Sequence, residues 1–145
     1  MFNKILVVCI GNICRSPVGE ALLKHHFQQQ KRNIMIASAG LAAMVNAPAA
    51  PFSIQIMDAA GIDIHSHRAQ QLTEQMAREF DLILVMEQEH QKEIEALFPF
   101  ARGKVFRLGH WRNLNIPDPY QHPKTAFDKM VEDVRLCATD WIDKI

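Results

Sequence analysis

The residues from Cys9 to Ser16 have the types and spacing of a phosphate-binding loop that also carries a nucleophile. A cysteine thiolate can attack phosphorus, and Cys9 is followed by Arg15 after five intervening residues. An arginine guanidinium can hold two phosphate oxygens in a planar, bidentate arrangement. The intervening backbone is expected to turn its amide N–H groups toward a bound phosphate dianion. This backbone comprises Ile10, Gly11, Asn12, Ile13 and Cys14.

The segments on either side of this loop favour a buried strand and then a helix. Residues 4–8 form a short apolar run, and Ser16-Pro17 is typical of a helix start with a hydroxyl N-cap and a proline at the first helical position. Gly11 is expected to turn the loop through backbone conformations closed to other residues. The positive end of the helix would favour the thiolate form of Cys9, and the Ser16 hydroxyl could donate to its sulfur.

A carboxyl group late in the chain is the candidate proton donor. Displacing an alkoxide or phenoxide from phosphorus requires an acid, and the same group can later activate water as a base. Asp118 lies between Pro117 and Pro119, whose rings restrict the backbone. Pro-Asp-Pro alone is more typical of a turn, but beside a phosphate loop Asp118 is the leading candidate. Tyr120, the single tyrosine of the sequence, would line the mouth of the pocket.

The elements that must position these residues alternate between strands and helices, which predicts an α/β fold with right-handed crossovers and a parallel sheet covered on both faces. Beyond the first strand, strands are expected at 34–38, 81–86 and 103–108, and helices at 17–30, 51–60, 71–79, 87–98 and from about 124 onward. The polar residues of the helix at 87–98, His90 among them, are expected to face solvent. Leu41 and Met44, in the irregular loop after the second strand, are candidates for an apolar wall of the pocket.

Composition and charge restrict the class of protein. A length of 145 residues with 48% hydrophobic residues predicts a single domain over residues 1–145. The formal net charge is +0, so the composition lacks the excess of basic residues that is typical of proteins that bind nucleic acid. No apolar run approaches the ~20 residues that span a bilayer, so direct membrane insertion is not expected. Because nothing typical of an export signal precedes the first strand, we expect a cytoplasmic location.

The cysteines and histidines argue against a disulfide framework and a metal site. Three cysteines are an odd number, and no export signal accompanies them. Cys9 and Cys14 flank one loop, so a reversible disulfide and simple packing of Cys14 are both open. Cys137 lies on an apolar helical stripe and is expected in the core. The histidine pairs, His65 with His67 and His110 with His122, lack coordination spacing, and a thiolate bound to zinc could not attack phosphorus.

Two motifs make the sequence resemble the low-molecular-weight protein tyrosine phosphatases. These motifs are Cys9-x5-Arg15-Ser16 and Asp118-Pro119-Tyr120. Residues 38–40, 67–69, 81–86 and 109–111 extend the resemblance over essentially the whole chain. The resemblance implies a single phosphatase domain, a three-layer α/β/α sandwich with a four-stranded parallel sheet, and hydrolysis of protein phosphotyrosine without cofactor or metal.

The resemblance also implies roles for individual residues. Cys9 would be the nucleophile, Arg15 the phosphate clamp and Asp118 the general acid and base. Ser38 and His67 would support the loop by hydrogen-bonding Asn12, a role that the sequence by itself does not single out. The residues expected to bind substrate are Ile10, Gly11, Asn12, Ile13, Cys14, Ser16, Leu41 and Tyr120.

Within this family the chain most resembles a bacterial branch. Gly109-His110-Trp111 and Leu41 are similar to enzymes that act on tyrosine autokinases controlling capsule and exopolysaccharide export, which implies a membrane tyrosine autokinase as partner. Two departures are visible. Gln70 stands where the family often has arginine, and Gln121 stands where eukaryotic members have a second tyrosine.

Three other functions compete with phosphotyrosine hydrolysis. Thioredoxin-coupled arsenate reductases share the Cys-x5-Arg loop but need further cysteines, and residues 72–91 contain none. Protein arginine phosphatases typically carry threonine at the position of Ile13, whose apolar side chain favours an aryl phosphate. A catalytically silent phosphotyrosine-binding module would need neither the nucleophile Cys9 nor the acid Asp118.

Overall fold

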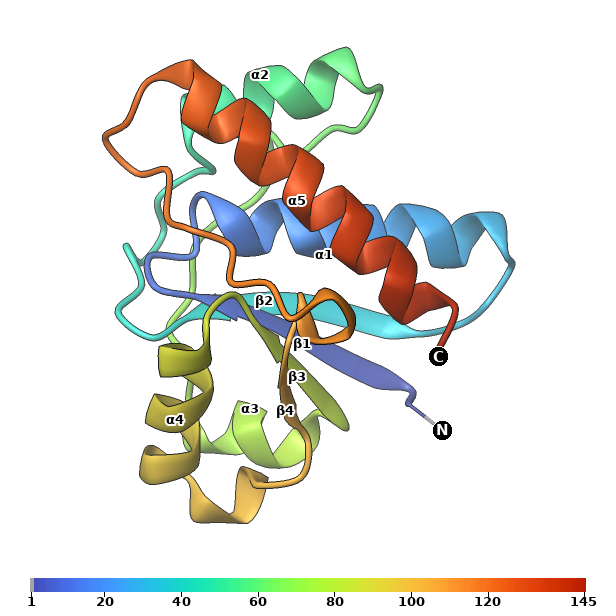
Figure 1. The fold of residues 1–145 in the computed structure, drawn as a ribbon, viewed down its shortest axis with the longest axis vertical. Coiled ribbons are helices and arrows are strands. Elements are labelled where there is room, and N and C mark those ends of the chain that lie inside the picture. Colours follow the sequence, from blue (N-terminus) through green and yellow to red (C-terminus); the bar gives the residue numbers. More distant parts are fainter. Residues whose placement is uncertain (1) are drawn as a thin grey trace.

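Four parallel strands form one sheet in the order β2-β1-β3-β4 (Figure 1). The strands are β1 (Lys4–Cys9), β2 (Met35–Gly40), β3 (Leu82–Val85) and β4 (Val105–Arg107). The structure is a computed structural model that describes residues 2–145. Met1, with which the expected single domain begins, lies outside the described residues.

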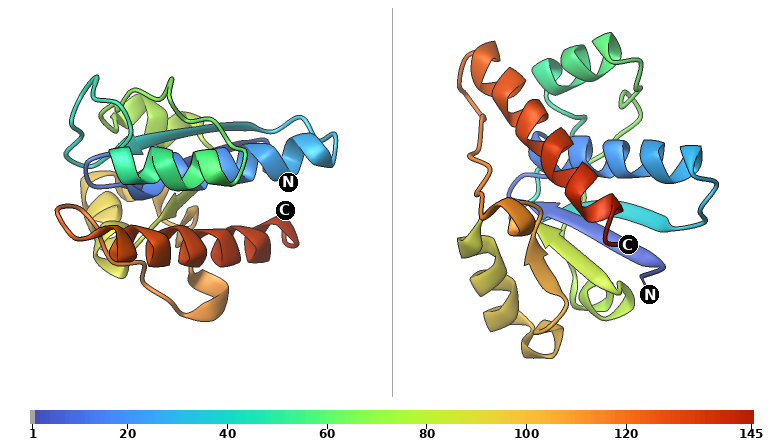
Figure 2. Two further views of the ribbon diagram at one scale, coloured as in Figure 1. Left: turned by 90° about the horizontal axis from the view of Figure 1, so that it is seen from above. Right: turned by 45° about the vertical axis from the view of Figure 1, so that its right-hand side comes forward.

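Helices cover both faces of this sheet, as Figures 1 and 2 show. One layer contains α1 (Arg15–Gln29), α2 (Pro51–Ala59) and α5 (Lys124–Ile142), and the opposite layer contains α3 (Glu74–Glu79) and α4 (Gln88–Leu97). Two short 3-10 turns, Pro99–Ala101 and His110–Arg112, flank β4. The arrangement confirms the expected three-layer α/β/α sandwich. Within residues 2–145, no helix is both long enough and apolar enough to cross a membrane.

The central strands are buried on both faces because successive side chains point into different halves of the core. Alternate residues of β1 and β3 join a larger apolar cluster with α1, α2 and α5, and the residues between them join a smaller cluster with α3 and α4. The first set is Ile5, Val7, Cys9, Leu82 and Leu84, and the second is Leu6, Val8, Ile83 and Val85. This explains why both strands have near-continuous apolar sequences.

The strand order places the carboxyl end of β1 at a switch point of the sheet. β1 pairs with β2 on one side and with β3 on the other, so the connections that leave these strands diverge at its end. Ligands of open parallel sheets bind in the crevice at such a point. Cys9 is the last residue of β1 and pairs with Gly40, the last residue of β2.

The long terminal helix confirms the expected apolar stripe. Its buried residues are Phe127, Met130, Val134, Cys137, Ala138, Trp141 and Ile142. Burial raises the pKa of the Cys137 thiol to about 11, so this thiol is neutral at physiological pH. Cys137 is therefore a core residue, as the sequence predicts.

Two local expectations are wrong. Helix α1 begins at Arg15 with Cys14 as its N-cap and without a side-chain capping bond, so Ser16 is not the cap. The Ser16 hydroxyl instead contacts Cys9 and Asn12. The helix predicted from residue 71 begins only at Glu74, because the side chain of Thr73 caps it by accepting a hydrogen bond from the Met76 N–H at 3.2 Å.

His90 is also not part of the solvated face of α4. Its side chain is buried, and its Nδ1 accepts a hydrogen bond from the backbone N–H of Glu87, the N-cap of α4, at 3.2 Å. Burial, reinforced by the positive charge of Arg15, lowers the pKa of His90 below its ordinary value of 6.5. A neutral imidazole can keep Nδ1 free as an acceptor. Glu89, Lys92 and Glu93 are exposed as expected.

Candidate active site

The loop at residues 10–14 connects β1 to α1 and turns its carbonyl groups away from the pocket. The carbonyls of residues 9, 10, 11 and 13 accept hydrogen bonds from the segment behind the loop. The bonds are Leu41 N to Cys9 O (2.9 Å), Ala42 N to Ile10 O (3.0 Å), Met44 N to Gly11 O (3.0 Å) and Ala50 N to Ile13 O (2.8 Å). Among residues 2–145, no acceptor pairs with the amide N–H groups of residues 10–14. These donors are therefore available to an anion.

The turn of the loop depends on Asn12 and not on Gly11. Asn12 has a φ of 59°, in the left-handed region that asparagine tolerates better than most residues. Gly11 does not have a positive φ, and a Cβ added there would meet its nearest neighbour, Cγ1 of Ile13, at 3.7 Å. The expectation that Gly11 makes the turn is therefore wrong.

Asn12 is fully buried, and its polar atoms are bonded to the surrounding elements. Its Nδ2 donates to Ser16 Oγ at 2.7 Å and to Ser38 Oγ at 3.0 Å. Its Oδ1 accepts from the Gln70 N–H at 2.9 Å, and its carbonyl lies 2.7 Å from His67 Nε2. The contacts predicted for Ser38 and His67 are thus present. Because its side-chain amide and its carbonyl are all paired, this network holds a strained residue in one conformation and leaves its N–H to face the pocket.

Two members of this network were missed by sequence reasoning. Gln70, at the position where the family often has arginine, also donates from Nε2 to the Ser38 carbonyl at 2.9 Å. Ser38 Oγ donates to Glu20 Oε1 at 2.5 Å, and Glu20 pairs with Lys24 at 2.6 Å. The helical spacing of Glu20 and Lys24 predicts their ion pair, but only the fold brings Glu20 to Ser38.

The candidate nucleophile lies at the base of the loop. Cys9 is buried, and its sulfur is 2.9 Å from Ser16 Oγ. Because Ser16 Oγ already accepts a hydrogen bond from Asn12, its own proton is free to be donated to the sulfur. This arrangement suits a thiolate, which can only accept.

Arg15 presents one edge of its guanidinium to the pocket and is anchored by the other. Its Nη1 donates to Glu87 Oε2 at 2.7 Å and to the Ile116 carbonyl at 2.8 Å. Its Nε is buried and has no partner among the described residues, and its Nη2 lies 3.8 Å from Asp118 Oδ2. A buried donor without a partner is costly unless a ligand completes it. The Nε and Nη2 edge has the geometry to bind two oxygens of a phosphate.

Glu87 is a residue that sequence reasoning missed, although its place two residues after the end of β3, at the carboxyl edge of the sheet, was a signal. We expect Glu87→Ala to lower the free energy of unfolding by about 2 kcal/mol, because buried Arg15 loses its ionic partner and the carboxylate is one-third exposed (33%). It should also weaken competitive inhibition by inorganic phosphate, since Nη1 of Arg15 is then held only by the Ile116 carbonyl. Denaturant titration and phosphate inhibition constants measure both effects.

Glu87→Gln is the matched control for this change, because an amide oxygen can still accept from Arg15 Nη1. It should restore part of the lost stability and most of the lost phosphate binding. An unchanged phosphate inhibition constant in Glu87→Ala would show that Glu87 does not position Arg15.

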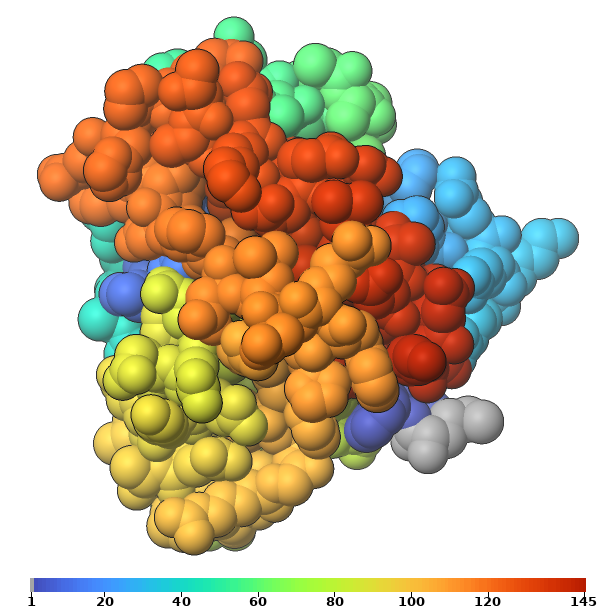
Figure 3. Space-filling view, in the orientation of Figure 1, coloured from blue at the N-terminus to red at the C-terminus, as the bar shows by residue number. Residues whose placement is uncertain are grey.

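These groups surround a pocket of about 210 Å³. Its lining residues are Cys9, Ile10, Gly11, Ile13, Cys14, Arg15, Ala42, Met44, Asp118 and Tyr120. In Figure 3 the blue loop is visible at the left edge of the molecule, between the orange segment that leads into α5 and the yellow-green start of α4. The fold thus brings the early loop with Cys9 and Arg15 together with the late loop that carries Asp118.

The mouth of the pocket is formed by the late loop. Asp118 Oδ1 accepts a hydrogen bond from the Tyr120 N–H at 3.0 Å, and both side chains are partly open to solvent. Met44 lines the pocket as expected, but Leu41 does not. The Leu41 side chain packs against the smaller apolar cluster on the other side of β2, and Ala42 takes the expected place.

Cys14 is the second thiol at this pocket. Burial raises its pKa to about 12, and the negative charges of Asp118 and Cys9 act in the same direction. Cys14 is therefore a neutral thiol at physiological pH and packs in the apolar core beneath the loop. All three cysteines are free, and a reversible disulfide between Cys9 and Cys14 stays a prediction.

Gly40 allows the end of β2 to approach the loop, which sequence reasoning did not foresee. A Cβ added at Gly40 would lie 2.4 Å from the Ile10 carbonyl oxygen, so the loop would have to move. We expect Gly40→Ala to lower the free energy of unfolding by about 1–3 kcal/mol. A displacement of about 1 Å in the loop would also reduce kcat/KM by roughly 10²-fold.

Thermal unfolding and steady-state kinetics test this expectation, with Gly11→Ala as the control for stability. A Cβ at Gly11 meets its neighbours at ordinary contact distances, so this variant should unfold like the parent protein. Equal stability and activity of Gly40→Ala and the parent would contradict the argument.

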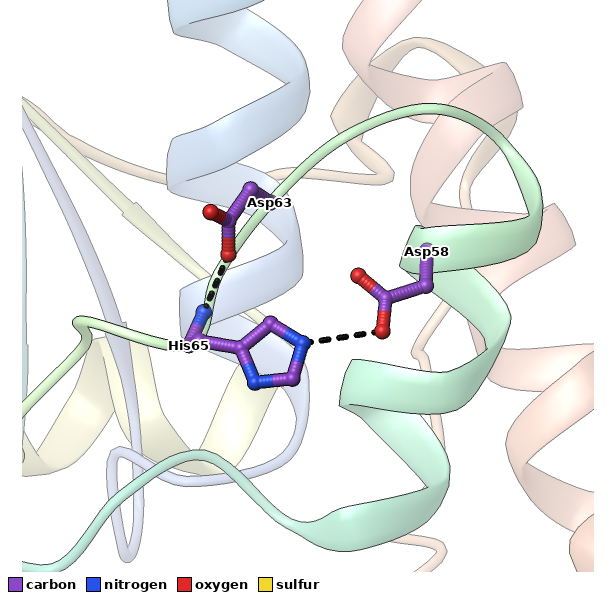
Figure 4. A group of neighbouring side chains, drawn as sticks. All are labelled: Asp58, Asp63 and His65. Atoms are coloured by element: carbon purple, nitrogen blue, oxygen red, sulfur yellow. Dashed lines mark hydrogen bonds and ion pairs between the residues drawn. The ribbon is translucent and has the colours of Figure 1, made fainter.

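Three exposed side chains lie together at the end of α2, as Figure 4 shows. His65 Nε2 is 2.9 Å from Asp58 Oδ2, and the His65 N–H donates to Asp63 Oδ1 at 2.8 Å. The hydrogen bond with Asp58 and its negative charge raise the pKa of His65 above its ordinary value of 6.5. This cluster joins α2 to the segment that carries His67, and we interpret it as a turn held by its own hydrogen bonds.

Comparisons with known proteins agree with this site. The family profile described as low molecular weight phosphotyrosine protein phosphatase matches residues 4–145. The low molecular weight protein-tyrosine-phosphatase Ptp of Acinetobacter johnsonii is 47% identical over 144 residues, which cover 99% of this chain and 99% of that protein.

Solved structures agree as well. Vibrio vulnificus Wzb in complex with benzylphosphonate superposes with a TM-score of 0.94 at 39% identity, and the match covers 100% of both chains. The YwlE arginine phosphatase from Geobacillus stearothermophilus has a TM-score of 0.90 at 27% identity, covering 99% of this chain and 92% of that one. By sequence over nearly its whole length, and by fold, this chain belongs to the low molecular weight phosphotyrosine protein phosphatase family.

Proposed function

We propose that this phosphatase works through a cysteinyl-phosphate intermediate on Cys9. A phosphotyrosine dianion in the pocket would accept hydrogen bonds from the amides of residues 10–14 and from Nε and Nη2 of Arg15, with phosphorus above the sulfur. Attack forms the S–P bond and breaks the bond between phosphorus and the tyrosine oxygen. That oxygen keeps the electron pair and takes a proton from Asp118. The observation that carries the proposal is the buried Nε of Arg15, which has no partner among residues 2–145 and belongs to the same pocket as Cys9.

The second step returns the enzyme to its starting state. Asp118, now a carboxylate, accepts a proton from a water molecule whose oxygen attacks phosphorus. The new P–O bond forms as the S–P bond breaks, and Cys9 leaves as a thiolate. The Ser16 hydroxyl, 2.9 Å from the sulfur, donates to this thiolate and stabilises it as a leaving group. Inorganic phosphate then leaves the pocket.

The walls of the pocket favour an aryl ester over other phosphates. Ile13 and Met44 are apolar, and Tyr120 can pack against an aromatic ring. Apart from the reacting groups Cys9 and Asp118, the lining residues that the structure describes offer no charged acceptor for a phosphorylated guanidinium group. This supports phosphotyrosine over phosphoarginine as the substrate.

The physiological substrate that we propose is a bacterial membrane tyrosine autokinase that controls capsule and exopolysaccharide production. The support is the similarity of Gly109-His110-Trp111 to the bacterial branch with that role. Trp111 is half-exposed in the turn between β4 and α5, where a partner protein can reach it. A cytoplasmic location, where such kinases carry their phosphotyrosines, is part of this proposal.

Phosphate release from three matched peptides, carrying phosphotyrosine, phosphoserine or phosphoarginine, tests the reaction. We expect turnover of the phosphotyrosine peptide alone, and loss of that turnover in Cys9→Ser. Turnover of phosphoarginine at a similar rate would assign the chain to arginine phosphatases. Binding without turnover would make it a silent recognition module. The same assay on an autophosphorylated tyrosine kinase domain tests the partner separately.

A further inference from the structure

A second hollow adjoins the active-site pocket. This groove has a volume of about 740 Å³ and lies between the loop after β2, the first turns of α2 and the start of α5. Figures 1 and 2 both place the start of α5 beside α2, and the rings of Phe52 and Phe127 pack edge to face across this junction at 5.4 Å. The lining residues are Ile13, Met44, Ala47, Pro48, Ala49, Ala50, Pro51, Phe52, Ile54, Gln55, Asp58, Tyr120, Gln121, His122 and Phe127.

The groove is continuous with the active-site pocket. Ile13, Met44 and Tyr120 line both hollows, so a polypeptide whose phosphotyrosine ring occupies the pocket passes directly into the groove. Met44 and Phe52 leave 45% and 36% of their surface exposed, respectively. Large apolar side chains exposed next to one another commonly mark a surface that binds another molecule.

The charges around the groove restrict its occupant. Among the described residues its lining contains Asp58, which pairs with His65, and His122, but no lysine or arginine, and Asp118 lies at the junction with the pocket. A carboxylate of the substrate would therefore approach Asp118 and would lose solvation without a lysine or arginine to pair with. Aliphatic or aromatic side chains would instead bury their surface against Pro51, Phe52 and Ile54.

We infer that this groove binds apolar side chains of the substrate protein that flank its phosphotyrosine. The inference rests on the proposed function, because it names the sequence class that the same site selects. In an extended peptide, residues two or three positions from the phosphotyrosine lie about 7–10 Å away, which is the reach needed to leave the pocket and enter a neighbouring groove. The phosphate determines where the substrate reacts, and the groove determines which phosphotyrosine is preferred.

The test compares three phosphotyrosine peptides that differ only two and three residues to either side of the phosphotyrosine. In the first peptide these positions carry leucine and isoleucine, in the second they carry serine, and in the third they carry aspartate. We expect kcat/KM for the apolar peptide to exceed that for the serine peptide by about tenfold, and the aspartate peptide to be the poorest substrate. p-Nitrophenyl phosphate, which has no flanking residues, reports the chemistry alone.

Two variants connect the selectivity to the groove. Phe52→Asn should abolish most of the preference for the apolar peptide while p-nitrophenyl phosphate turnover is retained. Gln55→Lys adds a cation to an exposed lining residue, removes no apolar packing, and should raise kcat/KM for the aspartate peptide several-fold. Leu97→Asn, which changes a more exposed apolar residue on α4 outside the groove, is the control and should change neither value.

The possible outcomes test the role of the groove and the catalytic mechanism separately. Equal kcat/KM for the three peptides, with normal p-nitrophenyl phosphate turnover, overturns the groove and leaves the phosphatase mechanism intact. Loss of turnover on every substrate contradicts the proposed function instead. If Phe52→Asn does not fold, an unaltered aspartate penalty in Gln55→Lys still overturns the inference. The chain could also form a dimer in sedimentation that Phe52→Asn dissociates without any change in peptide preference. That result would show that the groove binds a second copy of the chain and would overturn the inference.

Discussion

Cys9→Ser is expected to abolish phosphate release while the protein still binds a phosphotyrosine peptide. A serine hydroxyl is not ionised at neutral pH, so the variant lacks the nucleophile that forms the covalent intermediate, and turnover should fall by about 10⁴-fold or more. The groups that hold the phosphate, which are the loop amides and Arg15, are unchanged. Isothermal titration with a phosphotyrosine peptide and a continuous phosphate assay measure the two properties separately.

The neighbouring residues provide the controls for this result. Ser16→Ala removes the hydroxyl 2.9 Å from the sulfur and should slow turnover far less, because the nucleophile is still present. Residual turnover in Cys9→Ser would require another nucleophile, and Cys14 is the other thiol that lines the pocket. A pKa raised to about 12 makes Cys14 a poor nucleophile, so adding Cys14→Ser should change nothing further. Turnover that survives both changes would contradict the proposed mechanism.

The parts of the fold that local sequence determines were predicted correctly. The apolar run at residues 4–8 belongs to a strand buried on both faces, and alternating strands and helices form a parallel sheet with two helical layers. The position of the phosphate loop follows from these elements, because a loop after β1 in this strand order must lie at the switch point. Local sequence information was therefore enough to predict that Cys9 and Arg15 lie at one site.

What the sequence missed depends on contacts between distant segments. Glycine is the usual residue at a left-handed turn, yet Asn12 takes that conformation because its side chain and carbonyl find four partners from other elements. His90 has the sequence context of a surface residue, but the fold buries it near Arg15 and Asp118, which are distant in the sequence. Arg15 is anchored by the carbonyl of Ile116, a residue that no local pattern connects to it.

Asp118→Asn is expected to slow turnover of a phosphotyrosine peptide by about 10²–10⁴-fold while inorganic phosphate still inhibits at a similar or lower concentration. Asparagine cannot give up a proton to the leaving oxygen, which explains the loss. The neutral amide also removes a negative charge 3.8 Å from Arg15 Nη2, so a phosphate dianion should not be bound more weakly. Asparagine keeps an Oδ1 that can accept from the Tyr120 N–H, so the loop should retain its shape.

The leaving group provides the sharper measurement, because p-nitrophenolate departs readily without a proton. In Asp118→Asn the first step with p-nitrophenyl phosphate should stay fast, and the second step, which needs a base to activate water, should become limiting. Stopped-flow mixing should therefore show a burst of nitrophenolate close to one equivalent of enzyme, followed by slow release of phosphate. Asp118→Ala, which also removes the acceptor for the Tyr120 N–H, should show the same burst if the carboxyl acts as acid and base. If phosphate inhibition and turnover are instead lost together in Asp118→Asn, the residue supports the loop and another group must supply the proton.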